Sequence, residues 1–208
     1  AFRQLVSALH YCHEVKNVAH RGIKPSNLML EGIEGKLRVC DFGLSQFFEA
    51  RPERLNTSKM IKLTHQGVRY IPPEFIEDYL QSKYHMRDVE AQKKADIWAA
   101  GVTLYRLLTR EFPIKAANLM NLKTQLRSSE PVNLELIDQI EIRQLLSTML
   151  EKDPNKRCSV IQAAQSPWLT RNDGDPIDLD LSSMSSNAAP ASSEEEEEED
   201  EGEGSEGR

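Results

Sequence analysis

Two short polar segments hold the side chains of this chain that are best suited to chemistry. One is the loop His20-Arg21-Gly22-Ile23-Lys24-Pro25-Ser26-Asn27, and the other is Asp41-Phe42-Gly43. The three cysteines are far apart and form no Cys-x-x-Cys pair, which argues against a zinc site or a disulfide framework and for a reducing compartment.

The elements that must position these segments follow from hydrophobic spacing. Apolar residues at helical spacing between Phe2 and Cys12 predict an amphipathic helix before the polar loop. Two apolar runs at 28–30 and 37–40 predict a small β-hairpin that leads into the second polar segment. The 81–94 stretch reads as irregular, and the remaining body is predicted to be helical over 96–108, 140–150, 159–165 and, as a shorter piece, 74–80. The first of these helices is apolar nearly all round, so we expect it to be buried.

Charge is divided unevenly along the chain. Residues 1–172 hold 25 Lys and Arg against 19 Asp and Glu, whereas residues 173–208 hold 1 against 14. Such an acidic, Ser- and Glu-rich composition cannot bury enough apolar surface to fold. We therefore expect a folded domain over 1–171 and a disordered acidic tail over 172–208. A mildly basic body does not suit a nucleic-acid binder, and no apolar run is long enough for a membrane span.

Five motifs follow one another in a characteristic order: H-R-x-I-K-P-S-N at 20–27, D-F-G at 41–43, P-P-E at 72–74, D-I-W-A-A-G at 96–101 and an arginine at 157. With this order and spacing the chain resembles the C-terminal lobe of a eukaryotic protein kinase over about residues 1–170. The resemblance implies an α+β kinase-like fold that is mostly α-helical with a small β-hairpin. The Lys-Pro-x-Asn spacing is of the serine/threonine type. The closer likeness is to the calcium/calmodulin-dependent protein kinase kinases, which activate SNF1-type kinases.

The resemblance implies a role for several polar-segment residues. Asp41 matches the carboxylate that chelates Mg²⁺ across the phosphates of ATP, and Asn27 matches the amide that holds a second Mg²⁺. Lys24 matches the lysine that steadies the transferring phosphoryl group, and Arg21 matches the arginine that receives an activation-loop phosphate. Met29 belongs to the apolar run that matches the floor under the adenine.

Other matches are structural. Glu74 and Arg157 match an ion pair that ties the P-P-E segment to a late helix. Asp96 matches a helix carboxylate that holds the backbone of the His-Arg-x motif. The remaining matches belong to the hydrophobic spine and the D-F-G motif, and they are His20, Phe42 and Gly43.

Gly22 is the most consequential departure from the family pattern. Where the family reads His-Arg-Asp, this chain has glycine in the third position, and no side chain can act from there. The family's aspartate accepts the proton of the substrate hydroxyl, and a general base contributes about 10²–10⁴-fold to a rate. No threonine follows Gly67 either, although the family has one that bridges the catalytic aspartate and lysine. The two changes together predict impaired catalysis.

The family's glycine-rich loop and strand lysine are missing from the 208 residues, and the chain opens with Ala1 inside a helical pattern. We expect a fragment with its N-lobe absent, so that binding of ATP and Mg²⁺ is weak or absent. Two functions stay open: a partial serine/threonine kinase domain acting on a protein substrate, and a pseudokinase fragment that scaffolds or regulates a partner kinase. A third possibility is a gene-model fragment that is not stably folded. Calmodulin control is not supported, because no basic amphipathic helix follows Trp168. We expect a cytoplasmic location.

Overall fold

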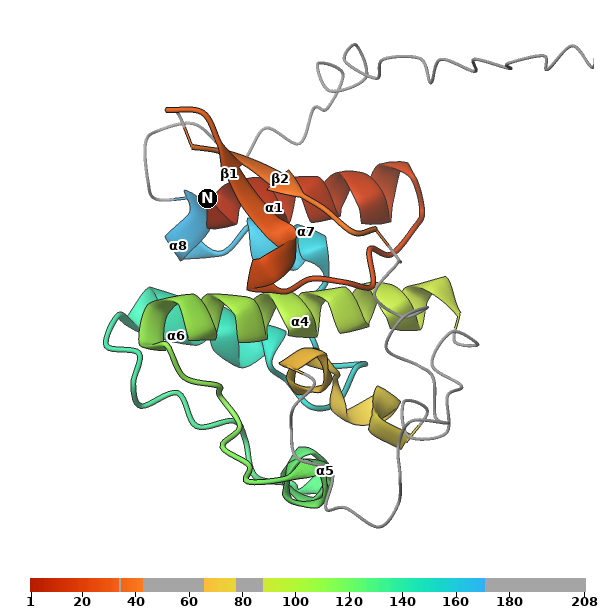
Figure 1. The fold of residues 1–208 in the computed structure, drawn as a ribbon, viewed down its shortest axis with the longest axis vertical. Helices are drawn as coiled ribbons and strands as arrows, with labels where there is room; N and C mark the ends of the chain where they lie inside the picture. Colours follow the sequence, from red (N-terminus) through yellow and green to blue (C-terminus); the bar gives the residue numbers. More distant parts are fainter. Residues whose placement is uncertain (34, 43–65, 78–87, 171–208) are drawn as a thin grey trace, which may run out of the picture.

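A computed structural model describes residues 1–33, 35–42, 66–77 and 88–170. The long helix α4 (Val89–Thr109) runs through the middle of the molecule, and the other elements pack around it (Figure 1). Within the described residues the only sheet has two antiparallel strands, so the predicted mostly helical architecture with a small hairpin is confirmed. No described helix has both the length and the apolar character that crossing a bilayer requires.

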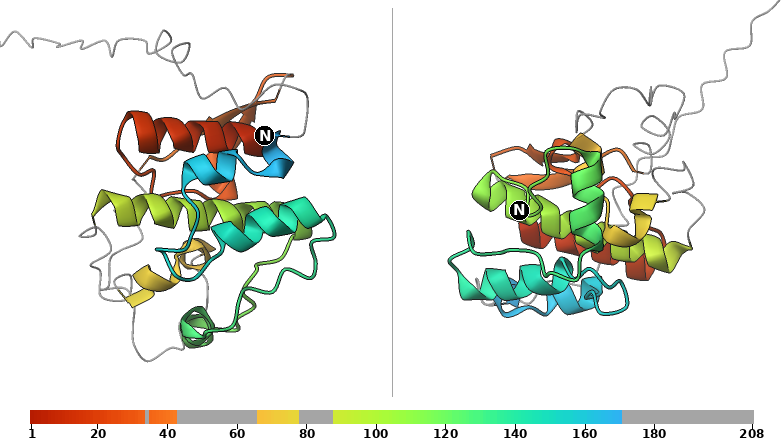
Figure 2. Two further views of the ribbon diagram at one scale, coloured as in Figure 1. Left: turned by 180° about the vertical axis from the view of Figure 1, so that it is seen from behind. Right: turned by 90° about the horizontal axis from the view of Figure 1, so that it is seen from below.

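The chain opens with helix α1 (Phe2–His10), which buries Leu5, Val6 and Leu9 on one face. This confirms the predicted amphipathic helix. The helix continues as a π-helical turn, Tyr11–Val15. From behind, α7 (Val160–Ala164) and α8 (Pro167–Thr170) lie beside α1 (Figure 2). The first helix of the chain therefore packs against its last described helices.

Strands β1 (Leu28–Glu31) and β2 (Lys36–Val39) form the predicted hairpin, with Leu28 paired to Val39. Gly32, in the connection between them, has φ +68°, a conformation that glycine adopts without strain. A hairpin alone is marginal in water, so it needs a surface to pack on. Here β2 packs on α1, and the inward side chains of Leu28, Leu37 and Val39 reach the core.

Helix α4 supplies most of the core. The predicted buried helix is confirmed, since every residue from Ala95 to Tyr105 is buried. Its start was predicted wrongly: the helix begins at Val89, inside the stretch expected to be irregular. The reason is Asp88, whose side chain accepts a hydrogen bond from the backbone N–H of Ala91 at 2.8 Å and caps the helix. Polar residues then form its first turns.

The remaining helices complete the lower half of the molecule. Helix α6 (Ile140–Met149) packs against α4, and α5 (Leu119–Arg127) lies farther down (Figure 1). A Cβ on Gly101 would come within 3.0 Å of Met149 and Leu150, so glycine permits the close approach of α4 to the end of α6. The short helix predicted at 74–80 is, within the described residues, a 3-10 turn (Pro73–Phe75) followed by helical residues 76–77. The predicted acidic tail lies outside the described residues.

Candidate functional site

Asp96, in the middle of α4, is the anchor of the polar loop. Its carboxylate is 1% exposed and accepts hydrogen bonds from the backbone N–H groups of His20 at 2.6 Å and Arg21 at 2.8 Å. The ring of His13 lies at 3.0 Å from the same carboxylate. A buried carboxylate needs such partners, because an unpaired charge in the interior is costly. These bonds fix the His-Arg-Gly backbone to the most buried helix of the fold.

The loop that follows is closed by its own hydrogen bonds. The side-chain amide of Asn27 donates to the carbonyl of Gly22 at 2.8 Å, and the backbone N–H of Asn27 donates to the carbonyl of Lys24 at 2.9 Å. Arg21 has φ +63°, which is unfavourable for a residue with a side chain. Such strain costs of order 1–3 kcal/mol and concentrates at functional sites. Gly22 is buried within this loop and presents no functional group.

The hairpin brings the two predicted metal ligands to the same end of the sheet. The backbone N–H of Cys40 donates to the carbonyl of Asn27 at 2.8 Å, so the strand ladder ends with Asn27 opposite the residue before Asp41. Asn27 is 3% exposed, whereas Asp41 is exposed and has φ +58°. The described residues contain no cluster of three or more His, Cys, Asp or Glu that could enclose a metal. A carboxylate and an amide still suit Mg²⁺, which keeps several waters and takes further ligands from phosphates.

His20 and Phe42 are in contact, with their ring centroids 4.8 Å apart in an edge-on arrangement. Burial lowers the pKa of His20, against the opposing influence of the Asp96 and Asp41 carboxylates. The ring is therefore neutral at neutral pH. Gly43, the third residue of the predicted motif, lies outside the described residues.

Two further predicted residues lie in the polar loop and on the strand that follows it. Lys24 is half-buried and immediately precedes the 3-10 turn Pro25–Asn27. Met29, on β1, is 55% exposed. The structure thus gathers Lys24, Asn27, Met29 and Asp41 around one loop and one hairpin.

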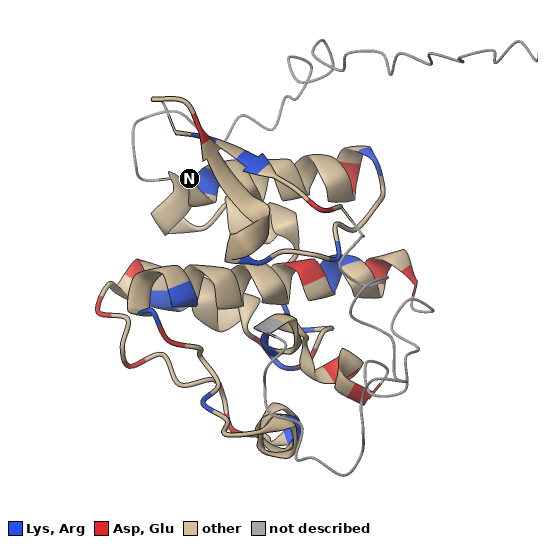
Figure 3. Ribbon diagram, viewed as in Figure 1, with Lys and Arg blue, Asp and Glu red and all other residues tan. Residues whose placement is uncertain are grey.

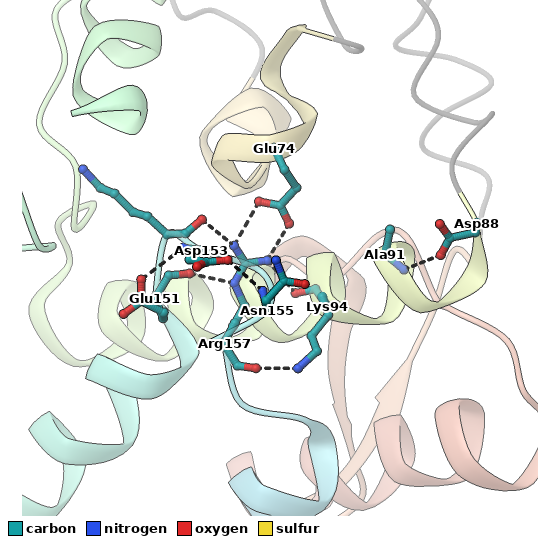
Figure 4. Close-up of polar contacts among 9 residues, drawn as sticks. Glu74, Asp88, Ala91, Lys94, Glu151, Asp153, Asn155 and Arg157 are labelled. Carbon is teal, nitrogen blue, oxygen red and sulfur yellow. Dashed lines mark hydrogen bonds and ion pairs between the residues drawn. The ribbon is translucent and has the colours of Figure 1, made fainter. Parts of the chain in front are cut away.

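Glu74 and Arg157 form a bidentate ion pair between the P-P-E segment and the chain just before α7 (Figure 4). The two N–O distances are 2.6 and 2.9 Å. The Arg157 side chain is fully buried, and it also donates to the carbonyls of Glu151 and Lys94. Its guanidinium lies 5.1 Å from the ring of Trp98. This pair and its neighbours tie together three segments that are far apart in the sequence, and it is separate from the polar loop.

Sequence reasoning missed the role of His13. Its partner Asp96 is 83 positions away in the sequence. It also missed a cluster in which the guanidinium groups of Arg69 and Arg106 both lie over the ring of Phe112. Contacts between such distant positions leave no local pattern, so no signal in a single sequence would have revealed them.

The structure has a strained loop pinned to a central helix, and a hairpin and an exposed aspartate follow that loop. Comparison with known proteins shows the family. The model of the protein kinase domain family matches residues 1–169, and the chain belongs to that family.

The related proteins are serine/threonine kinases. The chain is 34% identical over 176 residues to CBL-interacting serine/threonine-protein kinase 5 of Arabidopsis thaliana, which covers 85% of this chain and 36% of that protein. It is 36% identical over 174 residues to CBL-interacting serine/threonine-protein kinase 16 of the same plant, covering 82% and 34%. CBL-interacting protein kinase 5 of Oryza sativa subsp. japonica is 32% identical over 170 residues, covering 82% and 33%. The chain spans about a third of the length of these curated relatives. They give no specific support to the predicted closer likeness to calcium/calmodulin-dependent protein kinase kinases.

Proposed function

We propose that this chain is the lower lobe of a serine/threonine protein kinase in which phosphoryl transfer is impaired. The observation that carries the proposal is the loop at 20–27, which is held by Asp96 and by Asn27 but has glycine at position 22. The backbone that should present a proton acceptor to a substrate hydroxyl is in place, and the acceptor itself is missing. A general base contributes about 10²–10⁴-fold, so its loss alone leaves a weak enzyme.

The residues around the loop fit a nucleotide bound with Mg²⁺. Asp41 and Asn27 would hold the metal, Lys24 would contact the phosphate, and the exposed Met29 would lie against the adenine. When bound, Mg²⁺ neutralises charge that develops on the phosphates. These roles rest on the family resemblance together with the shared end of the hairpin. Because the family's glycine-rich loop and strand lysine are not in the 208 residues, we expect the chain as printed to bind ATP weakly.

A second candidate function is a pseudokinase that binds a partner kinase or a protein substrate without catalysis. Exposed apolar side chains beside the site favour it: Leu30 is 64% exposed and Phe42 is 49% exposed. Contiguous patches of exposed apolar groups are typical of surfaces that contact other proteins. On this proposal the loop is retained as a scaffold and not as a catalyst.

A phosphoryl-transfer assay tests the proposal. The chain is incubated with Mg²⁺, γ-labelled ATP and myelin basic protein, alongside the Gly22→Asp and Asp41→Ala variants. We expect no transfer above background from the chain as printed. Transfer that is lost in Asp41→Ala would contradict impaired catalysis. A gain of about 100-fold or more in Gly22→Asp would show that the rest of the site is competent.

Binding is measured separately by the melting temperature in Mg²⁺-ATP. A ligand that binds only the folded state raises the free energy of unfolding by RT ln(1 + [L]/Kd), so a rise in Tm that Asp41→Ala removes demonstrates a nucleotide site. No rise together with no transfer from Gly22→Asp would favour the scaffold. Resequencing the transcript through codon 22 and its 5′ end is the control for both experiments.

The domain boundary and the location are proposals of the same kind. We infer a folded unit over 1–171 and a separate acidic tail over 172–208. Limited proteolysis tests this boundary, because the first cuts should fall within the tail. The three free cysteines of the structure suit a reducing, cytoplasmic setting.

A further inference from the structure

A second polar cluster lies apart from the loop at 20–27. Arg69, in the 3-10 turn Gln66–Tyr70, and Arg106, near the end of α4, share one aromatic partner. Their guanidinium carbons lie 4.7 and 4.2 Å from the ring centroid of Phe112, and the ring of Tyr70 meets the same phenyl group edge-on at 5.7 Å. We call these four residues the Arg69–Arg106 cluster. Figure 3 shows basic residues near this carboxyl-terminal end of α4.

Within the described residues, this cluster carries positive charge and no carboxylate is in ion-pair contact with it. Arg69 donates to the carbonyl of Ala116 at 3.1 Å, and neither arginine forms an ion pair with any residue of the described ranges. Burial, and to a smaller extent the nearby charge of Arg106, lower the pKa of Arg69. Other arginines of the body, such as Arg38 and Arg127, face a carboxylate. A planar guanidinium fixed against an aromatic ring keeps its remaining N–H groups available to an anion.

We propose that the Arg69–Arg106 cluster is a binding site for carboxylate groups and that its occupant is the acidic run at 194–200 of the same chain. This proposal does not depend on the proposed kinase function. The run holds six glutamates and one aspartate, and residues 173–208 hold 14 acidic residues against one basic residue. Charge complementarity therefore favours this contact. Because the run is covalently attached to the body, its effective concentration is far above that of a free acidic peptide.

The length of chain allows the contact. The 24 residues from Thr170 to Glu194 reach at most about 80 Å when fully extended. A folded body of 170 residues has a radius of gyration of about 15 Å, so its opposite surfaces are about 40 Å apart. The run can reach any part of the body without disturbing its fold.

A zero-length cross-link tests the contact in the full chain. The Arg106→Lys variant keeps the positive charge and introduces an amine that a carbodiimide joins to a neighbouring carboxylate. We expect peptide mapping by mass spectrometry to find position 106 linked to 194–200 in the monomer. The matched control is Arg127→Lys, which introduces an amine at an exposed arginine paired with Glu77 and which should give no such link. In 0.5 M NaCl the yield at position 106 should fall about fivefold or more, because salt screens exposed charges.

Three outcomes would overturn the proposal. Equal yields at positions 106 and 127 would mean that the run meets the body at random. A link found only in cross-linked dimers would assign the run to a second copy of the chain. Links confined to the native lysines Lys59 and Lys62 would place the run on the basic segment at 51–62 instead.

A second measurement does not depend on the lysine variants. The Arg69→Gln and Arg106→Gln double variant removes both charges and keeps polar side chains that can donate hydrogen bonds. Cleavage of the run by a glutamate-specific protease should be severalfold faster in this variant than in the parent chain, while Arg127→Gln should match the parent. Unchanged cleavage in a double variant with the parent's far-UV circular dichroism would refute the contact.

Discussion

The buried ion pair between Glu74 and Arg157 gives the sharpest test of what holds this lobe together. Replacing Glu74 by glutamine keeps the shape of the side chain but leaves the fully buried guanidinium of Arg157 without its counter-charge. Removing one partner of a buried pair costs about 3–5 kcal/mol. We expect the lower end, about 3 kcal/mol, because Glu74 is 17% exposed and Arg157 still donates to the carbonyls of Glu151 and Lys94.

Thermal unfolding followed by circular dichroism measures the effect. In a domain of this size each kcal/mol shifts Tm by about 2–4 °C, so Glu74→Gln should lower Tm by about 6–12 °C. The control is Glu77→Gln, which removes an exposed carboxylate paired with Lys123 and Arg127. Exposed ion pairs contribute little to stability, so this control should shift Tm far less than Glu74→Gln does.

A double variant separates the charge from the packing. Glu74→Leu with Arg157→Met removes both charges, and replacing a buried pair by apolar groups is often close to neutral. The double variant should therefore be more stable than the single variant Glu74→Leu. The coupling energy follows from the free energies of unfolding of the parent, the two single variants and the double variant. If Glu74→Gln and Glu77→Gln lower Tm equally, the backbone carbonyls alone satisfy Arg157 and the reasoning fails.

Three further predictions concern the central helix and the loop that it holds. Asp96→Asn weakens the hydrogen bonds to the loop backbone and should lower the free energy of unfolding in urea by about 1–3 kcal/mol. Relative to the parent, backbone amide exchange should accelerate more at residues 20–21 than elsewhere in the chain. An equal acceleration at all residues would argue against an anchoring role for Asp96. Gly101→Ala places a Cβ 3.0 Å from the side chains of Met149 and Leu150 and should lower the free energy of unfolding by about 1–3 kcal/mol, despite the better helix propensity of alanine. An unchanged urea midpoint would show that α4 and α6 can separate freely. Burial lowers the pKa of His20 below its unfolded value of 6.5, so the contribution of His20 to stability is complete above pH 6.5 and is lost as the pH falls from there towards the folded pKa. Between pH 7.5 and 5.5 the His20→Asn variant should therefore lose less stability than the parent, as measured by urea midpoints. Equal losses would assign the pH dependence to other groups.

Local pattern was sufficient for much of the fold. Helical spacing from Phe2, the two short apolar runs and the apolar helix after Asp96 each correspond to an observed element, because amphipathic periodicity reports which face is buried. The start of α4 was predicted wrongly because the polar turns after Asp88 carry a weak hydrophobic signal. These turns are helical because Asp88 caps the helix and because α4 packs in the core from Ala95 onward.

The sequence by itself determined the family, the order of the motif residues and the absence of a side chain at Gly22, since these depend only on residue identity and spacing. Tertiary structure decided which of those residues meet. Asp96 reaches the loop across 75 positions, and Glu74 reaches Arg157 across 83. Phe112 gathers Arg69 and Arg106, which no motif connects. Such contacts depend on how the chain packs around α4, and a single sequence carries no local record of them.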